Sequence, residues 1–258
     1  MPEQDYQSLE ARWHDLFWSL EGEAAELPLL SRFLATAPAP ALYLGSGSGR
    51  LLAPLLTENF DITGLEPSAE MRSLCERTCP EARVMAVSWE EAELSQSFGS
   101  VLVPAFTFQL FAKPLQALRK MASALQPDGR IYLSLFFPWA ELLGDLPAGK
   151  WYRDAEASLP DGTLARLDTR FQLDEKRGLL RRRHLYRHLD AEGGELARYE
   201  TRQRIHWFTD LALQRLLDQA GLVICQEILD FDPELDPEAA EEPASVITLI
   251  LKCDTTGN

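Results

Sequence analysis

A cluster of glycines and one acid further along carry the clearest chemical signal in the sequence. The apolar run at residues 41–44 leads directly into Gly45, Gly47 and Gly49. Glycines let a backbone turn tightly and approach a ligand closely. Glu66 ends the next apolar run, about 20 residues past the first glycine, where a doubly wound sheet places an acid beside a ribose. This pattern predicts an adenosine-type cofactor at the carboxyl edge of a parallel sheet.

The spacing of the glycines separates this loop from two common nucleotide-binding loops. It reads G-x-G-x-G, whereas a dinucleotide-binding turn reads G-x-G-x-x-G and a P-loop ends in GK[ST]. A helix expected at 49–57 would offer the free amides of its first turn to the cofactor. We therefore expect Gly45, Ser46, Gly47 and Gly49 to contact the cofactor. For Glu66, a plain surface acid at a strand end is the alternative.

Alternating strands and helices must position these residues. Apolar runs predict strands at 41–45, 61–66, 82–87, 99–103, 130–136, 222–230 and 244–252. Apolar residues at helical spacing predict helices at 5–35, 49–57, 69–78, 113–125 and 209–220. Ser68 and Thr209 are expected N-caps. Such alternation predicts an α/β fold, a doubly wound, Rossmann-like sheet of seven mostly parallel strands.

The interval 150–206 interrupts this rhythm. Its apolar residues alternate with polar ones at 165–173, and the same period of two recurs at 179–189 and 196–207. Turn-like segments connect these runs. We expect a small insertion of three antiparallel strands with one apolar face.

Several segments resemble the motifs of class I S-adenosylmethionine-dependent methyltransferases. Residues 42–49 are similar to the family's first motif, hhDhGxGxG, with Tyr43 where an Asp or Glu is common. Residues 98–104 resemble its fourth-strand motif, with Gly99 in place of an Asp. The turn before the fifth strand is also similar, although Asp128 replaces a glycine. Further similar segments are 207–210, 219–222 and 229–252, so the resemblance covers about residues 38–140 and 205–253.

The resemblance implies S-adenosylmethionine as cofactor and assigns further residues to its site. Glu66 and Pro67 would hold the ribose, while Ser88 and Trp89 would lie near the adenine. Pro104 would line the methyl-transfer site. Substrate contacts would come from Phe106 and Gln109 in the same segment. For Trp89 and Phe106, packing in the core is the alternative.

The resemblance also implies a lid and a roof for the substrate. Residues 1–37 would form a helical lid, 38–149 and 207–258 the cofactor-binding domain, and 150–206 a roof that lies across the cofactor crevice. Tyr6 and Trp13 on the lid would contact the acceptor, unless the helix simply docks by its apolar face. Candidate proton acceptors are His14 and His206, with solvated histidines as the alternative. Arg183, within an arginine run, could bind an acidic group of the substrate or pair with neighbouring acids.

The composition of the chain disfavours several classes of binding partner. The chain has 258 residues and a formal net charge of −15, which disfavours general nucleic-acid binding. No apolar run is long enough for a membrane span, and no signal peptide is visible. Four cysteines, among them Cys75 and Cys79, are expected to be reduced and to pack rather than bind metal, as in a cytoplasmic protein. A homodimer is left open.

The expected function is methyl transfer from S-adenosylmethionine to nitrogen or oxygen of a small molecule. A bound sulfonium already activates its methyl group, so the protein mainly aligns the reactants and excludes water. Two alternatives stay open. One is a non-catalytic, regulatory protein that keeps the cofactor pocket, since Tyr43, Ser88 and Gly99 replace acids common in the family. The other is an RNA-modifying enzyme that uses the arginine-rich insertion.

Overall fold

The glycine cluster and Glu66 follow two neighbouring parallel strands of a seven-stranded sheet. The computed structural model describes residues 6–20, 24–235 and 243–254. Contacts divide the chain into two units, which we treat separately. Residues 25–137 and 207–258 form the sheet unit, and residues 1–24 and 138–206 form the insertion unit. The division thus falls at 24/25 and 137/138, whereas the sequence placed it at 37/38 and 149/150.

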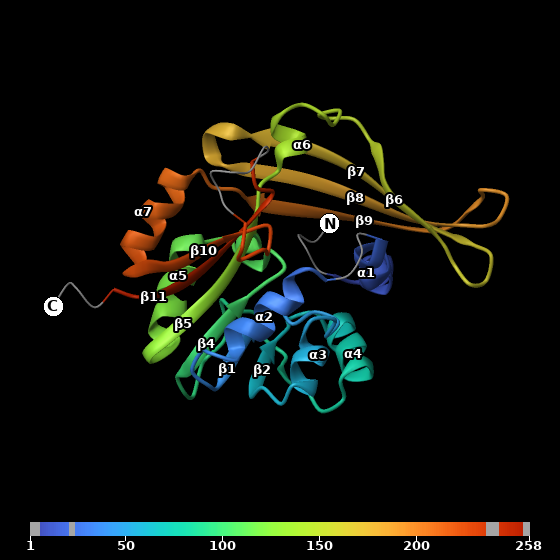
Figure 1. Ribbon diagram of the computed structural model, residues 1–258. Helices are drawn as coiled ribbons and strands as arrows, with labels where there is room; N and C mark the ends of the chain where they lie inside the picture. The colour runs from blue at the N-terminus through green and yellow to red at the C-terminus, as the bar shows by residue number, and fades with distance from the viewer. Residues whose placement is uncertain (1–5, 21–23, 236–242, 255–258) are drawn as a thin grey trace. The chain divides into compact units, whose positions relative to one another are not determined.

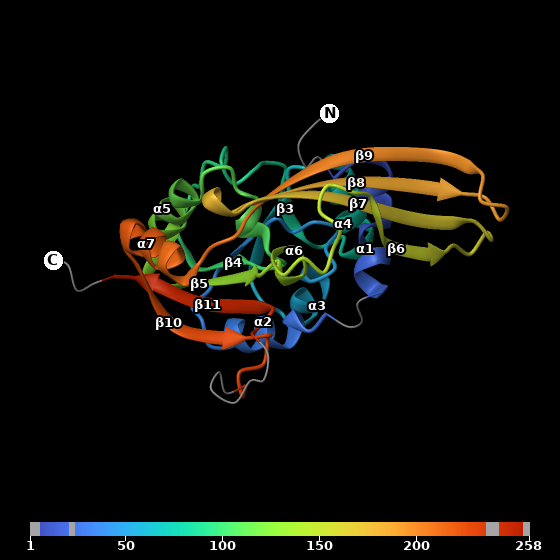
Figure 2. The same cartoon turned by 90° about the horizontal axis from the view of Figure 1, so that it is seen from above.

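In the sheet unit, the strands lie in the order β10-β11-β5-β4-β1-β2-β3 (Figure 1; β3 is labelled in Figure 2). Strand β11 is antiparallel to both of its neighbours, and the other neighbouring pairs are parallel. The predicted α/β fold with a mostly parallel sheet is therefore confirmed. The strands are β1 (Ala41–Leu44), β2 (Ile62–Leu65), β3 (Arg83–Met85), β4 (Phe98–Val103), β5 (Leu125–Phe136), β10 (Leu222–Leu229) and β11 (Val246–Cys253).

Helices cover both faces of this sheet. One face packs its leucines and valines against α5 and α7, through Leu118 and Leu217 among others. The other face carries Tyr132, whose ring meets that of Phe33 from α2 at 5.6 Å. Thr209 caps the start of α7, as predicted, by accepting a hydrogen bond from an amide three residues on. The helices are α2 (Glu26–Leu34), α3 (Leu52–Thr57), α4 (Ala69–Thr78), α5 (Pro114–Ala124) and α7 (Asp210–Ala220), with a 3-10 turn η1 (Thr107–Leu110).

The insertion unit holds a four-stranded antiparallel sheet in the order β6-β7-β8-β9 (Figure 2). Its strands are β6 (Tyr152–Ser158), β7 (Leu164–Asp174), β8 (Leu179–Leu189) and β9 (Glu195–His206). The three predicted strands are confirmed, and β6 is an addition that the sequence analysis missed. Short elements accompany the sheet, namely α6 (Trp139–Leu142) and the 3-10 turn η2 (Glu175–Arg177).

The helix predicted at 5–35 is two helices that belong to different units. Helix α1 (Ser8–Leu20) lies in the insertion unit, and α2 lies in the sheet unit. Residues 21–23, where the prediction ran straight through, lie outside the described residues. Helix α1 buries Leu9 and Trp13 against Leu167 and Tyr186 of the antiparallel sheet. Among the described residues, no helix has the length and apolar character needed to cross a bilayer.

Candidate functional site

The glycine loop needs its glycines for conformation and for space. Gly45, Gly47 and Gly49 have φ angles of +69°, +58° and +85°, a region that favours residues without a Cβ. A Cβ on Gly49 would lie 2.8 Å from the Sγ of Cys79 and 3.0 Å from that of Cys75. At Gly49 the loop is thus held close to α4 with no room for a side chain.

The two cysteines beneath the loop pack as small apolar residues, as the sequence predicted. The Sγ atoms of Cys75 and Cys79 are 3.5 Å apart, and both residues are buried. Burial raises the pKa of the Cys75 thiol to about 12 and also raises that of Cys79. Thiols with raised pKa values are poor nucleophiles and poor metal ligands at neutral pH. Their contribution here is to support the loop.

Glu66 connects the glycine loop to the start of α4. Its Oε2 accepts a hydrogen bond from the Gly47 amide at 2.9 Å, and its Oε1 accepts one from the Ser68 amide at 2.8 Å. The guanidinium of Arg72 donates to the carbonyl oxygens of Glu66 and Pro67, at 2.7 and 2.8 Å. Each carboxylate oxygen has a second lone pair. The carboxylate therefore shapes the loop and can also accept sugar hydroxyls, and its ribose role stays a prediction.

Ser46 contributes a buried hydroxyl to the same loop. Its side chain is almost fully buried, and its Oγ has no hydrogen-bond partner among the described residues. A Cβ on Gly64 would lie 2.8 Å from this oxygen, so strand β2 leaves room for it only by carrying a glycine there. Buried polar atoms are normally satisfied. An unpaired hydroxyl beside three glycines with positive φ angles is what a loop shaped for a polar ligand would show.

After β3, Ser88 and Trp89 take structural roles. The Ser88 hydroxyl donates to the Glu91 carboxylate at 2.8 Å and accepts from the Glu91 amide at 3.3 Å, which closes a turn. Trp89 is 4% exposed, and its indole N–H points to the Ala117 carbonyl at 3.4 Å. This position favours the packing alternative for Trp89. A contact of Ser88 with adenine stays a prediction.

The segment after β4 lies at the carboxyl edge and has an unusual backbone. Ala105 and Phe106 have φ angles of +49° and +61°, which are costly for residues with a Cβ and cluster at functional sites. Pro104, just before them, is buried. The Phe106 ring lies against those of Phe136 and Phe231, at 5.1 and 6.5 Å between centroids. Phe106 is only half-buried, which leaves part of it open to a substrate.

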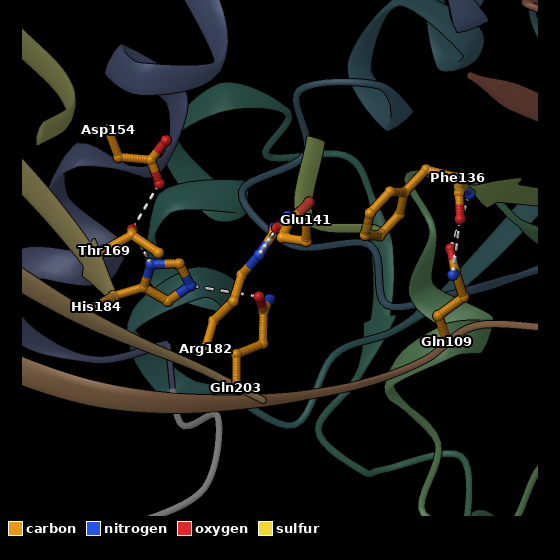
Figure 3. Close-up of polar contacts among 8 residues, drawn as sticks. All are labelled: Gln109, Phe136, Glu141, Asp154, Thr169, Arg182, His184 and Gln203. Carbon is orange, nitrogen blue, oxygen red and sulfur yellow. Dashed lines mark hydrogen bonds and ion pairs between the residues drawn. The ribbon is translucent and has the colours of Figure 1, made fainter. Parts of the chain in front are cut away.

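Gln109 is a positioning residue in this structure. Its Nε2 donates to the Phe136 carbonyl at 3.0 Å, and its Oε1 accepts from the Phe136 amide at 2.8 Å (Figure 3). Its side chain is buried. These two bonds imitate a strand pair and fix η1 to the end of β5. Gln109 thus has a scaffold role, and its contact with the substrate stays a prediction.

A hollow of about 390 Å³ also lies in the sheet unit, away from the glycine loop. It is lined by residues just before β4 and at the end of α5, including Ser97 and Lys120. These positions belong to the amino edge of the sheet. Open α/β sheets bind their ligands at the carboxyl edge. The glycine loop is accordingly the candidate site.

In the insertion unit, the predicted lid residues pack against the antiparallel sheet. Trp13 is 2% exposed and contacts His188 at 5.6 Å between ring centroids. This burial favours the docking alternative over a substrate contact. Tyr6 lies edge-on to His14 at 5.9 Å, and the His14 Nδ1 is 2.8 Å from the Asp15 carboxylate. His14 is thus oriented by its sequence neighbour, and its role as a base stays a prediction.

The arginines of β8 pair with acids. Arg183 donates to Glu200, with its Nε at 2.6 Å from Oε1. The preceding residue, Arg182, donates from its Nε and Nη2 to the Oε1 of the buried Glu141, at 3.0 and 2.5 Å (Figure 3). The alternative of pairing with neighbouring acids is therefore what the structure shows for Arg183. His206, at the end of β9, is half-buried, and burial followed by the charge of Arg204 lowers its pKa.

The same sheet contains a buried polar network that was not predicted from the sequence. The Thr169 hydroxyl donates to Asp154 at 2.5 Å, so its oxygen accepts from the Nδ1–H of His184 at 2.9 Å (Figure 3). The Nε2 of His184 lies 3.3 Å from the Oε1 of Gln203. The face expected to be apolar is in part polar. The signal was a histidine and a threonine at buried positions of the alternating pattern.

We predict that His184 makes the protein sensitive to acid. Burial, followed by the charge of Arg182, lowers its pKa to about 4, below the ordinary value of 6.5. Its neutral form therefore favours the folded state above pH 6.5, and this contribution, about 3 kcal/mol, is lost as the pH falls toward 4. Urea unfolding at pH 7.5 and 5 measures it. His184→Gln should lose less stability on acidification than the wild type, and equal losses would contradict the prediction.

Comparisons with known proteins agree with the geometry of the glycine loop. A family model described as a methyltransferase domain matches residues 14–227. The chain belongs to the methyltransferase-domain family. No curated protein matches it in sequence.

Solved structures show how closely this methyltransferase follows known folds. The CcbJ methyltransferase of Streptomyces caelestis has a TM-score of 0.77 at 19% identity, over 98% of this chain and 99% of that one. The sugar N-methyltransferase KedS8 of Streptoalloteichus scores 0.67 at 21% identity over 92% of both chains. CalS10, an amino pentose methyltransferase of Micromonospora echinaspora solved with its S-adenosylmethionine, scores 0.67 at 16% identity over 98% and 100%. The fold, insertion included, is therefore that of class I S-adenosylmethionine-dependent methyltransferases.

Proposed function

We propose that the chain transfers the methyl group of S-adenosylmethionine to a nitrogen or oxygen of a small molecule, and that an amino sugar is the acceptor class to test first. S-adenosylmethionine as cofactor is supported by the glycine loop, which is hydrogen-bonded to Glu66 and has the unpaired hydroxyl of Ser46 beside it. The acceptor class is supported by two structural neighbours whose names describe sugar and amino pentose methyltransferases.

The residues of the loop fit an adenosyl cofactor. Gly45, Gly47 and Gly49 would lie against it with bare backbone, and Glu66 would accept the ribose hydroxyls. When bound, the cofactor supplies a methyl group activated by a sulfonium. The protein then needs to align the acceptor and exclude water, and an amine acceptor must reach the site without its proton. Phe106 and Pro104 would form the apolar wall near the transferred methyl.

Two observations weigh against the alternative functions. Three arginines of β8, namely Arg182, Arg183 and Arg187, are paired with acids, which leaves less positive charge for RNA. Gly99 replaces a family acid for a structural reason, since a Cβ there would lie 2.4 Å from the backbone of Pro38. This substitution is thus no sign of lost catalysis. A reduced, cytoplasmic setting is part of the proposal, as all four cysteines are free.

The test is a methyl-transfer assay on the full chain. Isotope-labelled S-adenosylmethionine is incubated with a panel of amino sugars, their hydroxyl counterparts and bulk RNA, and products are read by mass spectrometry. Label on an amino sugar or a hydroxyl sugar supports the proposal and identifies the atom. Label on RNA instead would overturn it. Tight binding of S-adenosylhomocysteine with no transfer to any of a broad panel would favour the regulatory alternative.

A further inference from the structure

One buried carboxylate at the carboxyl edge of the sheet has no assigned role. Glu26 begins α2 and is 6% exposed. Its Oε2 accepts a hydrogen bond from the Ala105 amide at 2.9 Å, directly after β4. Its Oε1 has no hydrogen-bond partner among the described residues. Burying an unpaired carboxylate oxygen is costly unless a partner arrives.

The surroundings of Glu26 place it beside the glycine loop. The register of β1, β4 and β5 aligns Tyr43, Leu102 and Tyr132 in one row across the sheet. Tyr43 and Tyr132 face Glu26, and both have pKa values raised by burial first and by its charge second.

Other neighbours of Glu26 complete this environment. Burial raises the pKa of Glu26, whereas the hydroxyls of Ser134 and Tyr132, the Ala105 amide and the positive charge of Arg50 act to lower it. Arg50 directly follows Gly49, the last glycine of the loop. In addition, a Cβ on Gly45 would lie 3.0 Å from the side chain of Thr107, so the loop and the segment after β4 touch. One acidic and one basic side chain thus lie together where these two segments meet.

Glu26 supplies a carboxyl group that the first motif lacks, because Tyr43 stands where similar methyltransferases commonly have an acid. Strand β1 carries this buried phenol where similar methyltransferases commonly carry an acid, and a phenol with a raised pKa supplies no negative charge at neutral pH. Glu26 brings a carboxylate to the same end of the sheet from helix α2. A carboxyl group is therefore supplied here from a helix, where similar methyltransferases commonly supply it from the strand.

We propose that Glu26 binds the amino-acid end of the cofactor, with its free oxygen accepting hydrogen bonds from the α-ammonium group. This inference rests on the proposed function, because the ligand is S-adenosylmethionine or its product. Arg50 supplies the opposite charge that the α-carboxylate of the same zwitterion requires. Glu26 is therefore a cofactor-binding residue, distinct from Glu66, which serves the ribose.

The test compares two ligands that share the adenosine part. S-adenosylhomocysteine has the amino-acid end, and methylthioadenosine lacks it. In titration calorimetry, Glu26→Gln should weaken S-adenosylhomocysteine at least tenfold and change methylthioadenosine less than twofold. The matched control is Glu58→Gln, an exposed acid of the same unit, which should change neither. Thermal unfolding with and without ligand checks that each variant is folded.

A ligand-side measurement keeps the inference testable if Glu26→Gln folds poorly. The wild type should bind S-adenosylhomocysteine lacking only its α-amino group at least tenfold more weakly than the parent compound. In a folded variant, the losses from Glu26→Gln and from removal of the amino group should not add, since both delete one interaction.

Failure of the inference about Glu26 and failure of the proposed function would give different results. Unchanged binding of S-adenosylhomocysteine by Glu26→Gln, whether turnover is kept or lost, would overturn the inference. Equal loss for both ligands would also overturn it, because the effect would then be on the whole pocket. Failure of the wild type to bind S-adenosylhomocysteine at all would instead remove the proposed function.

Discussion

Replacing Glu66 with alanine is expected to weaken the binding of S-adenosylhomocysteine by at least about a hundredfold. Two ribose hydroxyls lose a charged acceptor, at about 1.5 kcal/mol or more for each bond, and a tenfold change in affinity corresponds to about 1.4 kcal/mol. The structure adds a second cause. The Gly47 and Ser68 amides lose their acceptor, so the glycine loop loses its connection to α4. Titration calorimetry measures the change.

The affinities of the variants for two ligands distinguish the ribose role of Glu66 from the roles of other acids. Glu66→Ala should weaken methylthioadenosine as strongly as S-adenosylhomocysteine, because both contain the ribose. Glu76→Ala, at an exposed position of α4, is the matched control and should leave both affinities unchanged. An affinity for S-adenosylhomocysteine within threefold of the wild type would show that Glu66 only supports the loop.

The local parts of the fold could be predicted from the sequence. Strands such as β1 and β4 are short apolar runs buried on both faces, and their composition alone reveals them. The glycine loop is equally local, because positive φ angles and lack of space both demand glycine at fixed positions. Glu66 followed from its distance to that loop. These features depend on neighbours in sequence.

Two elements were wrong or missing because their signals are weak. Strand β6 consists of Tyr152–Ser158, and it is rich in charged and small residues that favour strands little. The N-terminal helix was extended through 21–23 because apolar residues recur at helical spacing on both sides. Nothing in that periodicity shows that α1 and α2 pack on different sheets. Tertiary packing decides both cases.

The missed site residues depend on partners far away in sequence. Glu26 lies within the helix predicted at 5–35 without any sign of a role, and only the fold brings it to Ala105. His184 directly follows the arginine run, and its partners Thr169 and Gln203 come from two other strands. Gln109 and Trp89 have side chains that suit a site, and in the structure both make hydrogen bonds within the scaffold, while their contacts with ligands stay predictions. Residue type identified these candidates, and three-dimensional contacts assigned their roles.

Restoring the family residue at Gly99 is expected to destabilise the protein by more than about 3 kcal/mol. A Cβ at this position would lie 2.4 Å from the backbone of Pro38, and backbone cannot swing aside as a flexible side chain does. The Gly99 amide also donates to the Pro40 carbonyl at 2.9 Å, which fixes the segment across the start of β4. Gly99→Asp adds a buried charge to this overlap, and each effect costs about 1–3 kcal/mol or more. Urea unfolding measures the loss.

Two further variants divide this loss into its causes. Gly99→Ala keeps the overlap without the charge and should lose most of the stability that Gly99→Asp loses. Ser97→Asp places the same charge at an exposed position two residues earlier and should stay within about 0.5 kcal/mol of the wild type. If Gly99→Ala were as stable as the wild type, the close approach of Pro38 would not constrain this position. Glycine here would then have to be explained by the function of the chain, and the regulatory alternative would regain its main support.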